Sequence, residues 1–231
     1  MRIEDEYTVL EQQMLGYEDY CEVPVKSSRE VMVPILGSMS LTTSIIREDA
    51  IPITGKRTYV REGVYERLVQ SAAILNEQSG LTLDVCYGYR ALSVQQARFE
   101  QALQRVSAAI SGKERLATAH RQVAVPEVAG HPAGAAVDVR LLKDGIGLDF
   151  GTELWEYKDG LEGKRSYYGA PDISPQARWN RRVLRKAMVA SGFAPFDGEW
   201  WHFSYGDKEW ARYYNKSTAL YDQIEFRGPD V

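Results

Sequence analysis

The 231-residue sequence contains only three histidines, and two of them stand in unusual local sequences. His131 stands seven residues before Asp138, and the residues between them are mostly small, in the run HPAGAAVD. Small residues allow close backbone approach, so an imidazole before a strand and a carboxylate on that strand can converge on one ion. Glu199 and His202 form a second cluster, EWWH, whose two tryptophans can exclude water and shape a pocket.

These residue types suit a catalytic metal. Two imidazoles and one carboxylate are a common ligand set for catalytic zinc, in which an open fourth position holds water for hydrolysis. His131, Asp138 and His202 are the candidate ligands, which leaves Glu199 to act as a base. Residues three apart on a straight strand face opposite sides, so Glu199 must lie at the irregular start of its strand to reach the same metal.

Each of these residues also has a structural alternative. A single histidine is more often a surface residue or a satisfied core residue, and His120 is assigned to that class. Asp138 in an apolar strand needs a partner, but a salt bridge to an arginine would satisfy it as well as a metal. From these residues alone, both a zinc site and a structural role remain open.

Periodicity predicts the elements that position these groups. Apolar stripes at helical spacing predict helices over Arg61–Ser79, from Ser93 to Gly112 and from Ser174 to Gly192. The second begins with a possible capping box of Ser93 and Gln96, and each of the three ends at a glycine.

Alternating runs predict two strands with one buried face each, Leu81–Val85 and Val137–Leu141. The aromatic run Glu199–Tyr205 predicts a third strand. Strands and helices in this mixed order indicate an α+β domain. The stretch Lys143–Tyr168, with five glycines and many charges, predicts a long loop, and such loops are often functional.

The length fits one domain with a substantial core. We expect residues 1–50 to form an N-terminal extension packed on the core and residues 51–231 to form the functional domain. The charge of the chain gives no sign of a nucleic-acid partner, because charged residues are spread along the sequence and the net charge is −4. The sequence has no 18-residue apolar stretch, and its first twenty residues are acidic without an apolar run, so no secretory signal is expected. The two cysteines are then expected to be reduced thiols in a cytoplasmic protein. Oligomeric state cannot be inferred.

These motifs resemble those of the zinc D-alanyl-D-alanine dipeptidases and carboxypeptidases, the VanX-like proteins of peptidase family M15. The run from His131 to Asp138 is similar to their His-x-x-Gly-x-Ala-x-Asp motif, and EWWH to their Glu-x-x-His motif. The tryptophan pair favours the dipeptidase branch. The resemblance spans roughly residues 52–205. It also includes the stretches Gly88–Arg90, Gly163–Tyr168, Asn180–Arg185 and Ser191–Phe193.

The resemblance implies one Zn²⁺ per chain held by His131, Asp138 and His202, with Glu199 as general base and Arg90 stabilising the oxyanion. It implies a small antiparallel sheet carrying the zinc, flanked by helices, as in the hedgehog-like D,D-peptidases. The expected reaction is hydrolysis of D-Ala-D-Ala or related short D-amino-acid peptides of peptidoglycan metabolism, with a small peptide as partner. The alternatives are a D,D-carboxypeptidase acting on longer muropeptides and a catalytically silent module that binds peptidoglycan fragments.

Three departures from the family pattern bear on substrate choice. Ala129 replaces a serine, and Tyr87 and Trp155 replace aspartates, so polar groups that help to hold a short substrate are lost. The expectation is a relaxed dipeptidase that also accepts a larger first residue. Glu153 or Glu156 would replace the missing contact to the substrate amine.

Overall fold

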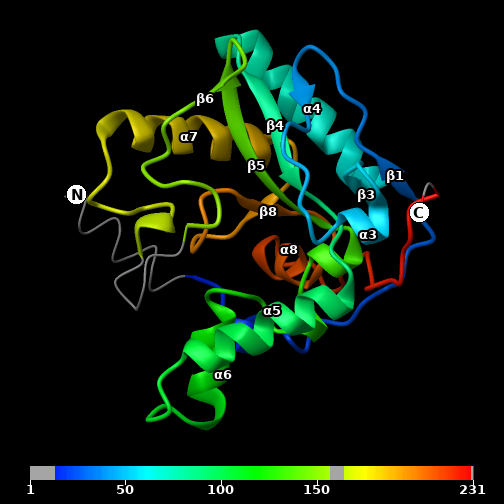
Figure 1. The fold of residues 1–231 in the computed structure, drawn as a ribbon, viewed down its shortest axis with the longest axis vertical. Coiled ribbons are helices and arrows are strands. Elements are labelled where there is room, and N and C mark those ends of the chain that lie inside the picture. The colour runs from blue at the N-terminus through cyan, green and yellow to red at the C-terminus, as the bar shows by residue number, and fades with distance from the viewer. Residues whose placement is uncertain (1–13, 157–163, 230) are drawn as a thin grey trace.

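The computed structural model describes residues 14–156, 164–229 and 231 (Figure 1). A six-stranded sheet forms its centre, in the order β2-β4-β5-β8-β7, with β6 paired to β5. Its strands are β2 (Leu41–Thr42), β4 (Thr82–Tyr87), β5 (Ala136–Lys143), β6 (Ile146–Gly147), β7 (Ala194–Pro195) and β8 (His202–Ser204). All pairs are antiparallel except β2 with β4. This confirms the predicted α+β fold with a small, mainly antiparallel sheet.

Two long helices, α4 (Glu62–Ser79) and α7 (Pro175–Ala190), pack against each other and against the sheet. Helices α5 (Leu92–Arg105) and α6 (Gly112–His120) lie together at one end of the molecule, at the bottom of Figure 1. Helix α8 (Lys208–Tyr213) follows β8. The shorter elements are α2 (Tyr17–Tyr20), β1 (Met32–Pro34), α3 (Ile51–Thr54), β3 (Tyr59–Arg61) and the 3₁₀ helices Pro126–Val128, His131–Ala133 and Lys164–Ser166.

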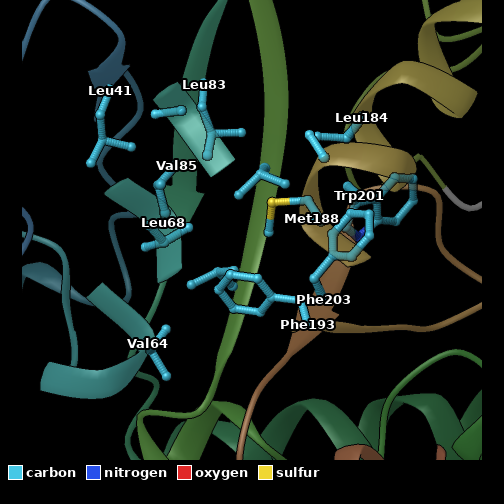
Figure 2. Packing of buried hydrophobic residues seen from close by; sticks show 14 of the residues in the cluster. Leu41, Val64, Leu68, Leu83, Val85, Leu184, Met188, Phe193, Trp201 and Phe203 are labelled. Carbon is cyan, nitrogen blue, oxygen red and sulfur yellow. The ribbon is translucent and has the colours of Figure 1, made fainter. Parts of the chain in front are cut away.

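The main core fills the space between these two helices and the sheet (Figure 2). Leu68 of α4 and Met188 of α7 belong to this core together with Val85 and Phe203 of the strands, and all four side chains are almost fully buried. Each such side chain contributes about 1.5–3 kcal/mol through removal from water. The core therefore holds β4, β5 and β8 in fixed positions.

Two of the predicted helices are confirmed and one is wrong. The region predicted as a helix from Ser93 to Gly112 contains two helices: α5 begins after Ala91 and ends at Arg105, and Gly112 begins α6 instead of ending α5. Val106 has extended backbone, which lets its side chain join a small cluster with Phe99. Ile110 packs on the same cluster from the connecting segment, so the apolar stripe continued although the helix did not.

The strand predictions need two corrections. β4 and β5 are buried on both faces along most of their length, so their burial does not alternate. Each strand also buries an aspartate, and Asp84 is paired with Arg140 Nε at 2.9 Å. The predicted strand Glu199–Tyr205 is too long, since β8 begins at His202.

The described part of the N-terminal segment adds short strands to the rest of the chain. β2 joins the central sheet, β1 pairs with β3, and Val25 bridges to Ala219. The domain boundary at residue 50 stays a prediction, as does the cytoplasmic location. Residues 1–13, and residues 157–163 of the predicted long loop, lie outside the described part. No helix in the described ranges has the length and apolar character needed to cross a bilayer.

Candidate metal centre

His131, Asp138 and His202 converge where β5 and β8 pair. Asp138 and His202 are directly opposite each other in the antiparallel register, and His202 Nδ1 lies 3.1 Å from Asp138 Oδ1. His131 comes from the 3₁₀ helix just before β5, and its Nε2 lies 3.4 Å from the same oxygen. The Gly88 carbonyl accepts a 2.7 Å hydrogen bond from His131 Nδ1, which leaves Nε2 as the donor atom for a metal.

The geometry of this cluster suits a tetrahedral zinc ion. Ligand atoms about 2.0–2.1 Å from zinc at tetrahedral angles lie about 3.3 Å from one another, close to the two distances observed. One ligand atom from each residue lies within 4.8 Å of the others. Two neutral imidazoles and one carboxylate are a donor set that zinc accepts. The residues present therefore fit the metal.

The charges in the cluster also favour a cation. Burial raises the pKa of Asp138, but His131 and His202 together hold it well below its usual range. Burial lowers the pKa of His202, yet the hydrogen bond and charge of Asp138 outweigh it and raise the pKa to about 9. Burial, with the nearby Arg90 guanidinium, lowers the pKa of His131 to about 4. Positive charge is thus stabilised at the His202 side of Asp138.

Glu199 reaches the cluster through a turn. The N–H of His202 donates to the carbonyl of Glu199 at 3.1 Å, so these two residues are brought to the same side of the chain. Glu199 Oε2 then lies 3.8 Å from His202 Nδ1. The turn provides the irregular strand start that the spacing of the motif required.

Arg90 enters from the loop after β4 and is 8% exposed. Its Nη1 donates to Gln95 Oε1 at 2.7 Å, and its guanidinium lies 4.7 Å from the centre of the Tyr87 ring. Within the described residues, the buried Nε of Arg90 has no hydrogen-bond partner. An unused donor therefore lies in the wall of the pocket that the metal cluster faces.

That pocket brings together the five predicted site residues. Its lining is formed by β5, the turn before β8, and helices α5, α6 and α8. His120 also lines it, but its Nε2 is 2.6 Å from the Tyr20 hydroxyl and its Nδ1 accepts from Val125 N. Its ring nitrogens are thus satisfied by the protein.

Trp155 was predicted to remove a polar group from the site, and the structure shows that it supplies another one. Its indole Nε1 donates to Asp138 Oδ2 at 2.7 Å, so each oxygen of that carboxylate has a neighbour. The Trp155 backbone is in the left-handed region at φ 58°, where a non-glycine residue is strained. The Arg47 guanidinium lies 4.4 Å from the indole ring centre. This contact was not readable from the sequence.

The loop that carries Trp155 is anchored by Arg181 of α7. Its guanidinium donates to the Phe150 carbonyl, at 2.8 Å from Nε, and to the Tyr167 and Arg165 carbonyls. The chain is therefore held before and after Trp155 by one buried side chain.

A His-Asp-His cluster with two buried members and a partly buried His202, opening to a pocket, has the form of a catalytic metal site, not of a closed structural one. The family model of peptidase M15, described as D-ala-D-ala dipeptidase, matches residues 40–220, and the chain belongs to this family. The family assignment made from the motifs is confirmed.

Curated relatives carry the same description. The D-alanyl-D-alanine dipeptidase of Synechocystis sp. is 29% identical over 237 residues, covering 90% of this chain and 95% of that protein. The protein of the same name from Enterococcus faecium is 33% identical over 92 residues, covering 39% of this chain and 43% of that protein.

The chain is also similar to solved structures at low sequence identity. The LdcB LD-carboxypeptidase gives a TM-score of 0.46 at 18% identity, covering 82% of this chain and 75% of that chain. A mutant of the D,D-pentapeptidase VanY in complex with Zn(II) gives 0.41 at 17% identity, covering 86% and 96%.

Trp155→Phe is expected to weaken zinc binding by about 10- to 100-fold, because an outer hydrogen bond that orients a ligand carboxylate is lost. Competition with a chromophoric chelator measures the affinity. Trp179→Phe, at an exposed position of α7, is the control and should bind zinc like the wild type. Equal affinity in all three proteins would contradict the role of the indole.

Proposed function

We propose that this protein is a zinc-dependent dipeptidase that hydrolyses D-Ala-D-Ala and related short D-amino-acid peptides. His131, Asp138 and His202 hold one zinc ion, Glu199 is the general base, and Arg90 stabilises the oxyanion. The observation that carries the proposal is the convergence of three ligand atoms beside Glu199, at the wall of one pocket. Membership of the M15 family and the names of the relatives support it.

The residues divide the reaction between them. When bound, zinc supplies Lewis acidity that activates water and polarises a carbonyl. Glu199, 3.8 Å from a ligand nitrogen, is placed to take the proton from the attacking water and to pass it to the leaving amine. Arg90 offers Nε, which has no hydrogen-bond partner among the described residues, to the negative charge that develops on the carbonyl oxygen.

The pocket wall at Ala129 and Trp155 bears on the choice of substrate. Ala129 presents a methyl group, and the one polar group of the Trp155 side chain is used by Asp138. Tyr87 is likewise engaged, since its hydroxyl donates to Asp49 at 3.2 Å. These side chains leave the first residue of the substrate loosely specified, which supports a relaxed dipeptidase.

Metal content tests the ligand set. His131→Ala and His202→Ala should each lose zinc as measured by elemental analysis, because each removes one of three ligands. His120→Ala is the matched control, since this third histidine lines the same pocket but is satisfied by Tyr20 and Val125. Full zinc occupancy in both ligand variants would show that the metal binds elsewhere.

Glu199→Gln should retain zinc and lose turnover by about a hundredfold or more, the usual effect of removing a general base. Arg90→Ala should cause a loss of similar size by removing an oxyanion donor. Single-turnover rates on the zinc-loaded proteins make the measurement, and added chelator should abolish wild-type activity until zinc is restored. Unchanged turnover in either variant would remove that residue from the mechanism.

A substrate panel tests the reaction class. The value of kcat/KM should be higher for D-Ala-D-Ala, and for dipeptides with a larger first D-residue, than for N-acetyl-D-Ala-D-Ala or a pentapeptide ending in D-Ala-D-Ala. Faster cleavage of the blocked or longer peptides would instead identify a D,D-carboxypeptidase. Zinc binding without cleavage of any peptide would identify a binding module.

A further inference from the structure

A buried carboxyl group, Glu209, lines the pocket but has no part in the chemistry proposed above. It belongs to α8, seven residues after His202, and is 9% exposed. Throughout the described ranges of the chain, its carboxylate forms no hydrogen bond and no ion pair. The group is therefore enclosed by protein and accessible from the pocket, yet unpartnered.

An enclosed carboxylate without a partner is unfavourable. Burial raises the pKa of Glu209 to about 8, against the positive charge of His202 and with a contribution from Asp207. Glu199 lies close enough to add a further negative charge. A cationic group that entered the pocket would relieve this penalty, so the surroundings of Glu209 favour a positively charged ligand.

Charged groups of both signs line the pocket. Arg90 lies near His131, and its guanidinium helps to lower the pKa of that imidazole after burial. Glu199 and Glu209 lie near His202. A free dipeptide is a zwitterion with an ammonium group at one end and a carboxylate at the other, which matches this distribution of charge.

We infer that Glu209 binds the α-ammonium group of a free dipeptide and is thus a specificity-determining residue of this enzyme. The inference rests on the proposed function. The amine nitrogen of the first residue lies about 2.5 Å from the scissile carbonyl carbon, so its partner must lie beside the metal ligands. Glu209 lines the same pocket as the three candidate ligands, and its charge helps to raise the pKa of His202. Glu153 and Glu156, which the sequence suggested for the role, line a separate cavity, and their own contact joins Glu156 Oε2 to Glu153 N.

A two-by-two comparison of proteins and substrates tests the contact. The proteins are the zinc-loaded wild type and Glu209→Gln, which keeps the shape of the side chain but removes its charge. The substrates are D-Ala-D-Ala and propionyl-D-Ala, the same dipeptide without its amine. Glu153→Gln is the matched control, and zinc content is measured in every protein.

Removing the amine should lower kcat/KM of the wild type by about 10- to 100-fold, the effect of losing a charge-assisted hydrogen bond. Glu209→Gln should lose a similar factor on D-Ala-D-Ala, mainly through KM, and should then discriminate between the two substrates by less than about twofold. Glu153→Gln should behave as the wild type does.

Equal losses on both substrates in Glu209→Gln would assign Glu209 a structural role and overturn the inference, as would an unchanged rate on D-Ala-D-Ala. If Glu209→Gln does not fold, Glu209→Asp enters the same comparison, and a KM that is raised for D-Ala-D-Ala alone supports the contact. A wild type that cleaves neither D-Ala-D-Ala nor any other panel peptide contradicts the proposed function itself. An active wild type whose preference survives Glu209→Gln contradicts only this inference.

Discussion

The negative charge of Asp138, buried within the sheet, must be balanced by its immediate neighbours. A carboxylate in such a place is costly unless it is paired or coordinated. One oxygen is approached by His131 and His202, and the other accepts from the indole of Trp155. The neighbouring groups lower the free-energy cost of burying this one charge, and they orient the carboxylate so that it can bind a cation.

The position of that charge is set by packing remote from the pocket. Side chains of α4 and α7 fill the far face of the sheet, so β5 and β8 cannot shift without opening the core. The Gly88 carbonyl fixes the ring of His131, and Arg181 fixes the loop that delivers Trp155. A metal site of the proposed kind depends on rigid support behind its ligands.

Which residues come together at the candidate site was more predictable from the sequence than their surroundings were. The residue types of His131, Asp138 and His202 made a shared metal site possible, and the resemblance of their motifs to the family assigned all three to it. Periodicity correctly predicted α4 and α7, whose apolar stripes face the core. It failed at Val106, where the apolar pattern continues although α5 has ended at Arg105. Glu209 was missed because nothing local distinguishes a glutamate on a short helix from a solvated one. Its burial depends on elements far away in the sequence.

The direct pairing of Asp138 with His202 across β5 and β8 also limits where insertions and deletions can occur in such a protein. Successive residues of a strand face opposite sides, so a single inserted or deleted residue inside β8 would turn His202 away from Asp138. Insertions in the connections outside these strands leave the pairing intact. The lengths of the connecting loops can therefore change during evolution. The pairing register of β5 with β8 cannot change by even one residue without separating Asp138 from His202.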